Sequence, residues 1–397
     1  MKHAFLLVLA GFFLSAAILS AANGKVIRFV YCSDLHYGLE REFRGAETGA
    51  DSVSRAMIAA FGLLENSALP EDGGVSGGEI FGSPDFIVCT GDIANRMEDG
   101  VQSASASWEQ FCSDWGKYIS CTVHSGAESG PEDGCRKCIP LYLVPGNHDI
   151  SNAIGYPKPL SPERDAASAA GIQRLMTMQC GDCGHVDAGE NACSGKPCST
   201  CGFDYSRDRT HYSFVMDSIR FVFMGMWPDS LNREWFCRET AADNDIPVFL
   251  FTHDPPEAES KHFTNPNGRH DINSTDRFQN LLSDTCSVKT TGEKPVENWR
   301  TLELFFGSHP EIKAYFHGDW NYNEFYTWHG PDGTISLPVF RVDSPMKGFI
   351  SSGDETLLSF IVVTIDTGSH TLTARECLWN ADRRPGIGWG ETATVQY

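Results

Sequence analysis

Apolar positions in the first third of the chain follow two different spacings. Short, nearly continuous apolar runs at 26–32, 85–90 and 141–144 are typical of strands that are buried on both faces. Between these runs, 52–66 and 108–119 carry apolar side chains every three or four residues, which predicts helices. This β, α, β, α, β order favours an α/β core whose inner strands are covered by helices.

The second half of the chain contains more segments of strand type. The pattern predicts a helix at 230–241 and strands at 212–215, 220–224, 248–252, 357–365 and 371–378. Short polar turns at 217–218 and 366–368 indicate hairpins. Together these segments predict an α/β fold with two mixed sheets packed face to face and helices outside.

The N-terminus has the pattern of a secretory signal. Lys2 precedes an apolar run from Ala4 to Leu19, and the small residues of Ser20-Ala21-Ala22 suit cleavage after residue 22. The run is short for a membrane span, and no later stretch approaches about 20 apolar residues. We therefore expect a signal peptide at 1–22, an exported protein (periplasmic or secreted) without stable membrane insertion, and a single domain at 23–397.

Composition and charge exclude several classes of protein. Hydrophobic residues make up 41% of the 397 residues, which is more than a disordered chain contains, and the length far exceeds that of a small disulfide scaffold. The formal net charge is -21. A protein that grips nucleic acid through its phosphates would instead be basic, so no nucleic-acid partner is expected.

The 14 cysteines are unevenly spread, and in an exported protein we expect most of them to be bridged. Five fall in a Cys-rich insertion at about 180–201, which includes two CxxC pairs: Cys180, Cys183, Cys198 and Cys201. Their spacing is close to that of a zinc ribbon, so structural zinc and disulfides that clamp the loop both remain open.

A cluster of polar residues follows each of five apolar runs of strand type, which lie at 26–32, 85–90, 141–144, 248–252 and 314–316. The clusters are Ser33-Asp34-Leu35-His36, Thr90-Gly91-Asp92, Pro145-Gly146-Asn147-His148-Asp149, His253-Asp254-Pro255-Pro256 and His317-Gly318-Asp319-Trp320-Asn321. In open α/β sheets, ligands bind at the carboxyl ends of the strands. We therefore expect these five clusters to form one site.

The residue types in these clusters suit a metal site. If extended backbone continues through Asp34 and His36, both side chains face the same way and can grip one cation. The glycine before Asp92 permits a tight turn, so that this carboxylate projects from the strand end, where it can bridge two ions. Asn147 offers an amide oxygen, and His148 beside it can face a substrate. Mixed oxygen and imidazole ligation favours manganese, iron or zinc over thiolate-binding metals.

The ordered set of motifs resembles the calcineurin-like metallophosphoesterase superfamily, whose signature is DxH, GD, GNH(D/E), a lone His and GHxH. Four of the five motifs occur here in that order, and the resemblance extends over about 26–378. It implies a four-layer α-β-β-α sandwich that binds two divalent or trivalent ions of manganese, iron or zinc at the strand ends. Residue by residue, it implies one ion on Asp34, His36 and Asp92, and the other on Asp92, Asn147 and His253. His148 would then stabilise the phosphoryl transition state or protonate the leaving group.

The fifth motif departs from the family pattern. Asp319 and Asn321 occupy the places of two metal-binding histidines. Both can ligate through oxygen, which favours a harder ion such as manganese, iron or magnesium. The displaced His317 is expected to point to the other face of its strand. Asn95 stands where many relatives place an aspartate that orients the histidine of GNH, and its amide can hold that ring by a hydrogen bond.

The resemblance implies hydrolysis of a phosphoester, either a monoester or a diester, by a metal-bound hydroxide that attacks phosphorus. The acidic chain favours a small phosphoester over a large polyanion. An alternative of another class is an exported pseudoenzyme or binding module of the same fold, whose metal site has degenerated at Asp319 and Asn321. Metal content would distinguish the two.

Overall fold

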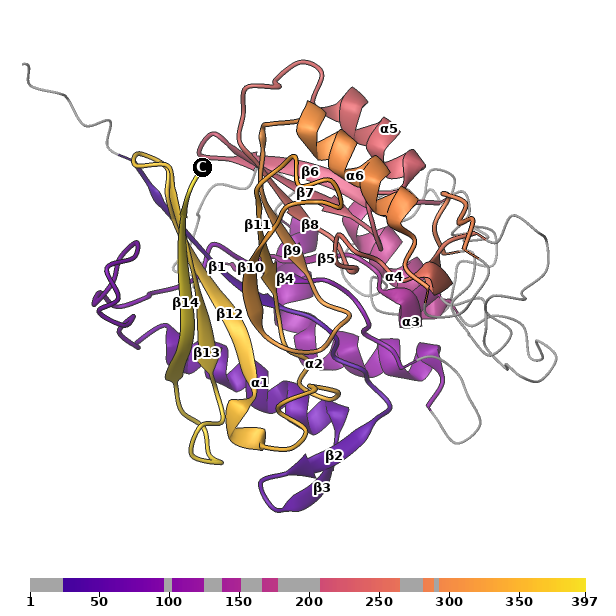
Figure 1. The fold of residues 1–397 in the computed structure, drawn as a ribbon. Helices are drawn as coiled ribbons and strands as arrows, with labels where there is room; N and C mark the ends of the chain where they lie inside the picture. The colour runs from indigo at the N-terminus through magenta and orange to yellow at the C-terminus, as the bar shows by residue number, and fades with distance from the viewer. Residues whose placement is uncertain are drawn as a thin grey trace, which may run out of the picture.

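The structure is a computed structural model, and it describes residues 24–95, 102–124, 138–150, 166–177, 208–264, 281–288 and 293–397 (Figure 1). The predicted signal peptide and the Cys-rich insertion lie outside these ranges. Within them, no helix is long and apolar enough to span a membrane.

Two six-stranded mixed sheets form the centre of the protein. The first sheet has the order β14-β13-β12-β1-β4-β5, where β1 is parallel to β4 and β4 to β5. Its strands are β1 (Val26–Cys32), β4 (Phe86–Cys89), β5 (Leu141–Leu143), β12 (Ser359–Asp366), β13 (Thr371–Leu378) and β14 (Gly388–Gln396).

The second sheet has the order β10-β11-β9-β8-β7-β6, and its four central strands are parallel. Its strands are β6 (His211–Met216), β7 (Ile219–Met224), β8 (Val248–Phe251), β9 (Ile312–His317), β10 (Glu324–Trp328) and β11 (Leu337–Arg341). A separate hairpin consists of β2 (Glu40–Phe43) and β3 (Ala46–Gly49).

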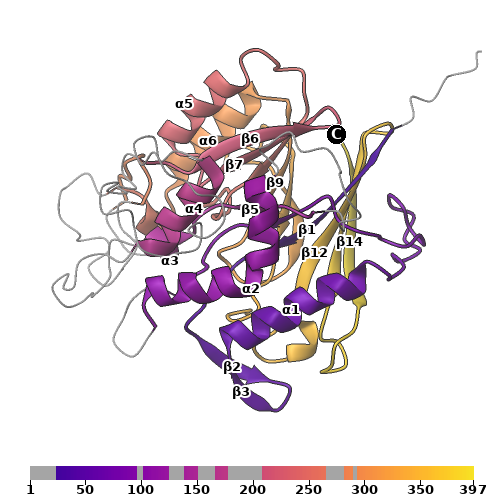
Figure 2. The ribbon, with the colours of Figure 1, turned by 180° about the vertical axis from the view of Figure 1, so that it is seen from behind.

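Helices cover the outer face of each sheet, as Figures 1 and 2 show from opposite sides. The first sheet is covered by α1 (Ala50–Leu64), α2 (Ala104–His124) and α4 (Ala167–Thr177), and the second by α5 (Ser230–Glu239) and α6 (Val296–Ser308). One-turn helices are α3 (Asn147–Ile150), η1 (Ser260–His262) and η2 (Glu355–Leu357).

Three apolar cores join these layers, and the alternation of side chains along β1 shows how. Phe29 and Tyr31 point toward the second sheet, into a core rich in phenylalanine from both sheets. Val30 and Cys32 point the other way and pack with α1 and α2. A third core lies between the second sheet and its helices. The four-layer α-β-β-α sandwich predicted from the sequence is therefore confirmed.

Some of the cysteines lie in the described part of the chain. Cys121 and Cys138 form a disulfide that ties the end of α2 to the segment before β5. The other described cysteines form no disulfide with one another, and they are Cys32, Cys89, Cys112, Cys237, Cys286 and Cys377. Five of these six are buried, so they serve as small apolar side chains rather than as crosslinks. Within the described ranges one disulfide is formed, and the prediction that most of the 14 cysteines are bridged stays a prediction, because the other six lie outside these ranges.

Candidate metal centre

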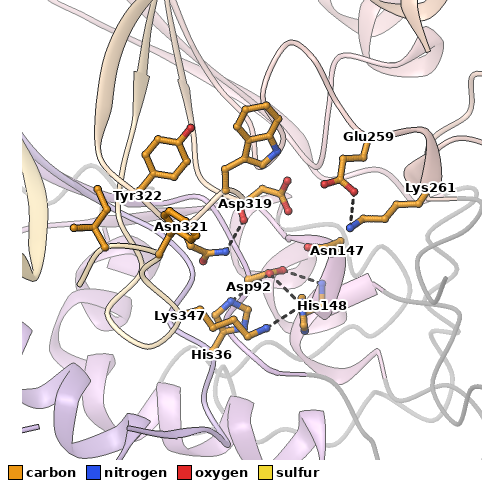
Figure 3. A pocket seen from close by; sticks show the side chains of 13 residues that line it. His36, Asp92, Asn147, His148, Glu259, Lys261, Asp319, Asn321, Tyr322 and Lys347 are labelled. Carbon is orange, nitrogen blue, oxygen red and sulfur yellow. Dashed lines mark hydrogen bonds and ion pairs between the residues drawn. The ribbon is translucent and has the colours of Figure 1, made fainter. Parts of the chain in front are cut away.

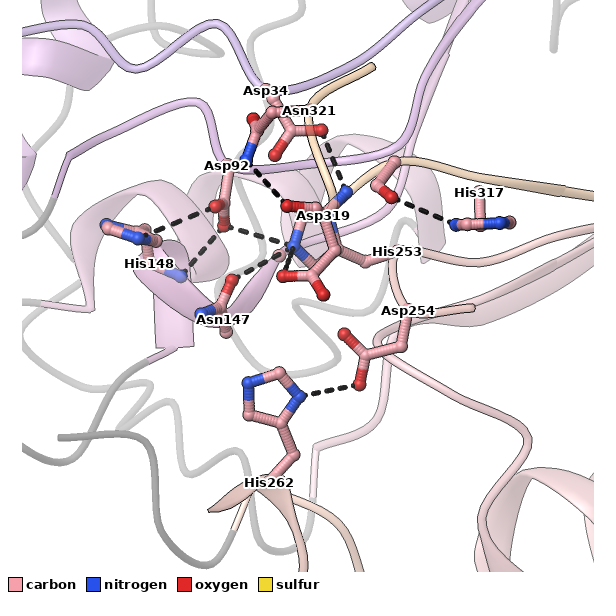
Figure 4. Close-up of polar contacts among 12 residues, drawn as sticks. Asp34, Asp92, Asn147, His148, His253, Asp254, His262, His317, Asp319 and Asn321 are labelled. Atoms are coloured by element: carbon pink, nitrogen blue, oxygen red, sulfur yellow. Dashed lines mark hydrogen bonds and ion pairs between the residues drawn. The ribbon is translucent and has the colours of Figure 1, made fainter. Parts of the chain in front are cut away.

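Five loops meet at the carboxyl ends of parallel strands of both sheets (Figure 4). The loop after β1 carries Asp34 and His36, and the loop after β4 carries Asp92. β5 is followed by Asn147 and His148, β8 by His253, and β9 by Asp319 and Asn321. The sequence places these side chains at strand ends, and the packing of the two sheets brings those ends together.

The backbone at these positions is unusual. Asp34, His36, Asp92, Asp319 and Asn321 all have positive φ, between 45° and 61°. Each such residue costs of the order of 1 kcal/mol or more, and such strain collects at functional sites. The first strand ends at Cys32, so Asp34 and His36 do not lie on extended backbone. The periodicity argument for their shared direction is therefore wrong, and the left-handed turns aim both side chains instead.

Glycines let the loops approach closely. Gly91 has φ of 103°, and a Cβ atom on it would lie 2.3 Å from the backbone nitrogen of Gly146. A Cβ atom on Gly146 would lie 2.2 Å from Asp92 Oδ1, and one on Gly318 would lie 2.2 Å from Asp34 Oδ2. Any larger residue at Gly91 would therefore push the neighbouring loop away, and at Gly146 or Gly318 it would displace a carboxylate of the site.

Backbone hydrogen bonds join the loops in series. Asp34 N donates to the carbonyl of Gly91 (2.9 Å), and Gly318 N donates to the carbonyl of His253 (3.0 Å). The carboxylate of Asp149, which completes the GNHD motif, accepts from the backbone nitrogens of Ala94 (3.1 Å) and Gly146 (3.0 Å). Asp149 thus connects the loop of Asp92 to that of His148. Its carboxylate stabilises the two loops and is not a candidate metal ligand.

Asp92 lies at the centre of the site. Its Oδ2 is 3.6 Å from His36 Nε2 and 3.8 Å from His148 Nε2, and its Oδ1 is 3.4 Å from His253 Nε2. Asp34 Oδ1 completes one side, 3.7 Å from His36 Nε2. Asp92 therefore belongs to two groups of side chains that could each hold a cation, one with His36 and His148 and one with Asp34 and His253.

A third such group surrounds His253. Its Nε2 is 3.7 Å from Asp319 Oδ1, and ligand atoms of His253, Asp254 and Asp319 lie within 4.8 Å of one another. The other ring nitrogen, Nδ1, is 2.7 Å from the carbonyl oxygen of Thr90, so the ring is held in place from behind. Asp319 is therefore close enough to His253 for both side chains to bind one cation.

The amide of Asn147 faces the same place. One of its terminal atoms lies 3.1 Å from both carboxylate oxygens of Asp92 and 3.0 Å from His253 Nε2. If the amide nitrogen of Asn147 lies there, it donates to the carboxylate of Asp92. If the amide oxygen lies there, a positive charge is needed between it, the carboxylate of Asp92 and the ring of His253. Neutral Asn147 therefore suits a site whose protein ligands are mostly anionic.

Burial and neighbouring charges shift the pKa values of the side chains in the site. Burial raises the pKa of Asp92 well above its usual value; the charge of His253 opposes this and the nearby Asp34 adds to it. Burial lowers the pKa of His253, but the carboxylates of Asp92, Asp34 and Asp319 outweigh it and bring that pKa to about 10. Burial, followed by the charge of Lys347, lowers the pKa of His36 to about 3. The site thus concentrates negative charge that calls for a positive partner.

Three further expectations have clear outcomes. Asn321 lines the cavity, and its Oδ1 is buried without a hydrogen-bond partner among the described residues, while its Nδ2 donates to the carbonyl of Asp319 (2.6 Å). His317 points away, as expected, and its Nε2 lies 3.2 Å from the hydroxyl of Tyr326. Asn95 is buried, and its Oδ1 makes no hydrogen bond within the described ranges, so the expected contact through that oxygen to His148 is not formed.

A cavity of about 740 Å³ opens over the centre (Figure 3). Besides the predicted ligands, it is lined by Trp320 of the fifth cluster and by the nearby Tyr322, and by side chains that sequence reasoning missed: Glu259, Lys261, Lys347, Phe349 and Ile350. Lys347 Nζ lies 3.2 Å from His148 Nε2. Lys261 Nζ instead pairs with Glu259 at 2.6 Å. No local motif marks these residues, because distant loops bring them to the cavity.

Comparison with known proteins places the chain in a family. The family model for calcineurin-like phosphoesterases matches residues 27–336, most of the chain and all five clusters. The chain belongs to the calcineurin-like phosphoesterase family. The family is one of metal-dependent phosphoester hydrolases, and its members typically bind a dinuclear metal site. A search of curated proteins found no match.

A comparison with solved structures matched chains of low sequence identity. The structure of PhoD has a TM-score of 0.48 and 10% identity, over 95% of this chain and 70% of that one. A conserved uncharacterized protein of Streptococcus pneumoniae TIGR4, titled a predicted phosphoesterase, has a TM-score of 0.32 and 9% identity, over 94% and 99% of the two chains. Vps29 of Chaetomium thermophilum has a TM-score of 0.29 and 10% identity, over 93% and 95%.

Proposed function

We propose that this calcineurin-like phosphoesterase hydrolyses a small phosphomonoester or phosphodiester by attack of a hydroxide on phosphorus, with two metal ions bound side by side. The observation that carries the proposal is the position of Asp92. Its two carboxylate oxygens face different histidines, Oδ2 toward His36 and Oδ1 toward His253. One carboxylate can therefore serve two cations at once.

The donors fit such ions. Asp34 and His36 would hold the first ion with Asp92, while Asn147, His253 and Asp319 would hold the second with Asp92. Buried oxygens without hydrogen bonds in the described ranges, Asp34 Oδ1 and Asn321 Oδ1, lie at the same place. Unsatisfied buried oxygens are costly in a folded protein, and ligation would satisfy them. The mixture of carboxylate, amide and imidazole suits manganese, iron or zinc.

When bound, the ions would lower the pKa of a water molecule and offset charge on the phosphoryl oxygens. His148 is placed to act on the leaving group. Although its Nε2 is 3.8 Å from Asp92, the ammonium of Lys347 lies closer to the same nitrogen, at 3.2 Å. A positive neighbour disfavours a further cation at that nitrogen. We therefore assign His148 to hydrogen bonding at the substrate, rather than to metal binding.

Lys347 would bind the phosphoryl group directly. Its loop is fixed to the site, because Ser344 Oγ donates to the carbonyl of Asp34 (2.7 Å) and accepts from Lys347 N (2.8 Å). The ammonium lines the cavity beside His36 and His148. A positive group at this point stabilises the charge that develops on the phosphoryl oxygens and the leaving oxygen.

Hydrolysis assays test the proposal. The purified protein is loaded with manganese, iron or zinc and assayed with p-nitrophenyl phosphate and with its bis-ester. Activity that is reduced at least about 100-fold in Asp92→Asn supports the proposal, and the preferred ester assigns the subclass. The control is Asp343→Asn, which alters a buried carboxylate outside the candidate groups. Metal-free, inactive and well-folded wild-type protein would favour a binding module instead.

We also propose, on the sequence pattern, that the protein is exported after removal of residues 1–22 and that 23–397 forms one domain. N-terminal sequencing of protein isolated from the producing cell's exported fraction tests the cleavage. An N-terminus at residue 23 supports export, and an intact N-terminus in the cytoplasmic fraction contradicts it.

A further inference from the structure

Asp254 and His262 form a buried pair beside the candidate centre. Both side chains are fully buried, and His262 Nδ1 lies 2.9 Å from Asp254 Oδ2. The other carboxylate oxygen, Asp254 Oδ1, is also buried, and no residue in the described ranges gives it a hydrogen bond. A buried carboxylate oxygen without a hydrogen bond destabilises the fold, and a cation bound at that oxygen would offset this cost.

The unpartnered oxygen faces the second cation position. Asp254 directly follows His253, and ligand atoms of these two residues and of Asp319 lie within 4.8 Å of one another. In Figure 4, Asp254 lies between His262 and Asp319. Asp254 is thus close enough to bind the second cation together with His253 and Asp319.

The direction of the Asp254 side chain is fixed by its main chain. Asp254 N donates to the carbonyl of Met226 (2.8 Å), and Asp254 O accepts from Thr252 Oγ1 (2.9 Å) and the hydroxyl of Tyr315 (2.8 Å). Three hydrogen bonds on one residue leave little freedom at its Cα. The carboxylate is therefore held toward the centre before any ion binds.

His262 is held equally firmly on the far side of that carboxylate. Its backbone carbonyl accepts from the backbone nitrogens of Leu281 (3.1 Å) and Leu282 (3.0 Å). With Nδ1 bound to Asp254 Oδ2, the ring fixes one oxygen and leaves the other turned to His253 and Asp319. Outer partners of this kind set the orientation of metal ligands.

We propose that Asp254 is a further ligand of the second cation, and that His262 positions it. Asp254 lies outside the family motifs. Together with Asp92 and Asp319, it gives the second ion three carboxylate ligands. Three carboxylates, one amide oxygen and one imidazole form a hard, oxygen-rich set, which fits Mn²⁺ or Mg²⁺ better than Zn²⁺. The inference rests on the proposed function, since it presupposes a cation there.

Manganese binding tests the inference without any activity assay. The full chain is stripped with a chelator, and isothermal titration with Mn²⁺ compares the wild type with Asp254→Asn, His262→Gln and the control Asp343→Asn. For Asp254→Asn we expect one ion to bind at least about tenfold more weakly, and for His262→Gln about tenfold more weakly. The control should bind as the wild type does.

The outcomes separate the two proposals. Wild-type protein that binds no Mn²⁺ contradicts the proposed function and, with it, the role of Asp254. Wild-type protein that binds Mn²⁺ while Asp254→Asn binds it equally tightly overturns only the role of Asp254. If Asp254→Asn does not fold, His262→Gln decides, because an unchanged affinity there overturns the inference and a tenfold loss supports it.

Discussion

Lys347 and Lys261 line the same cavity, which makes them a matched pair for testing how the phosphoryl group is bound. The perturbation is Lys347→Gln, which removes the charge and keeps most of the side chain. Lys347 Nζ contacts His148 Nε2, an atom that carries no negative charge, whereas Lys261 Nζ contacts the carboxylate of Glu259. The charge of Lys347 therefore lies beside the histidine that we propose contacts the substrate, whereas that of Lys261 lies against a carboxylate.

The expected magnitude follows from Coulomb's law. A unit positive charge about 5 Å from a unit negative charge contributes about 3 kcal/mol at an effective dielectric constant of about 20. Since about 1.4 kcal/mol corresponds to a tenfold change in rate, this is an upper value of about 100-fold. Lys347 is half-buried, and solvent screens part of its charge. We therefore expect kcat/KM to fall between about 10-fold and 100-fold.

The assay is steady-state hydrolysis of p-nitrophenyl phosphate at saturating manganese, with Lys261→Gln as the control. The control should lose less than about fivefold, because its charge is already paired. Metal content is measured in parallel, so that a loss of ions is not mistaken for a loss of phosphate binding. Equal losses in the two variants, or full activity in Lys347→Gln, would refute this assignment.

Three further predictions concern stability and the packing of the site. Asp72→Asn should lower the free energy of unfolding by about 2–4 kcal/mol in urea titrations, because it leaves the fully buried Arg375 without its bidentate carboxylate. The Arg375 guanidinium lowers the pKa of Asp72 to about 2, so this stabilisation is complete above about pH 4 and disappears as the pH falls toward 2; in the variant that part of the acid dependence should vanish. Cys121→Ser should cost about 3 kcal/mol in the same titration, since the disulfide closes a 17-residue separation, and an unchanged midpoint would contradict it. Gly146→Ala should weaken manganese binding at least about tenfold, because its Cβ atom would displace Asp92; wild-type affinity would show that the loops have room.

The sequence predicts much of the fold because its strands are short, continuous and apolar. The predicted strand at 26–32 coincides with β1, and the predicted hairpin around 217–218 is formed by β6 and β7. Segments without a strong apolar pattern were missed. β2 is largely exposed, and the edge strand β14 is mostly polar, so neither shows the spacing of a buried strand.

The residues of the candidate site can be predicted from the sequence where they belong to a motif. Those that tertiary packing brings in from distant loops cannot. Asp92 and His253 stand directly at strand ends, and their convergence follows from the order of the strands. Lys347 reaches the cavity from a loop after the last strand of the second sheet, and His262 reaches Asp254 from a one-turn helix, so no spacing could reveal them. Asp254 was visible as a carboxylate beside the lone histidine, but its unpartnered oxygen is a property of the packed structure alone.

The most direct test of the account is the metal content of Asp92→Asn. Wild-type protein and the variant are purified after loading with Mn²⁺, and the ions per chain are counted by mass spectrometry, with Asp343→Asn as the control. The account predicts two ions in the wild type and the control, and loss of both from the variant, because the two candidate positions share this one carboxylate. Two ions retained by a folded Asp92→Asn variant would contradict the central claim.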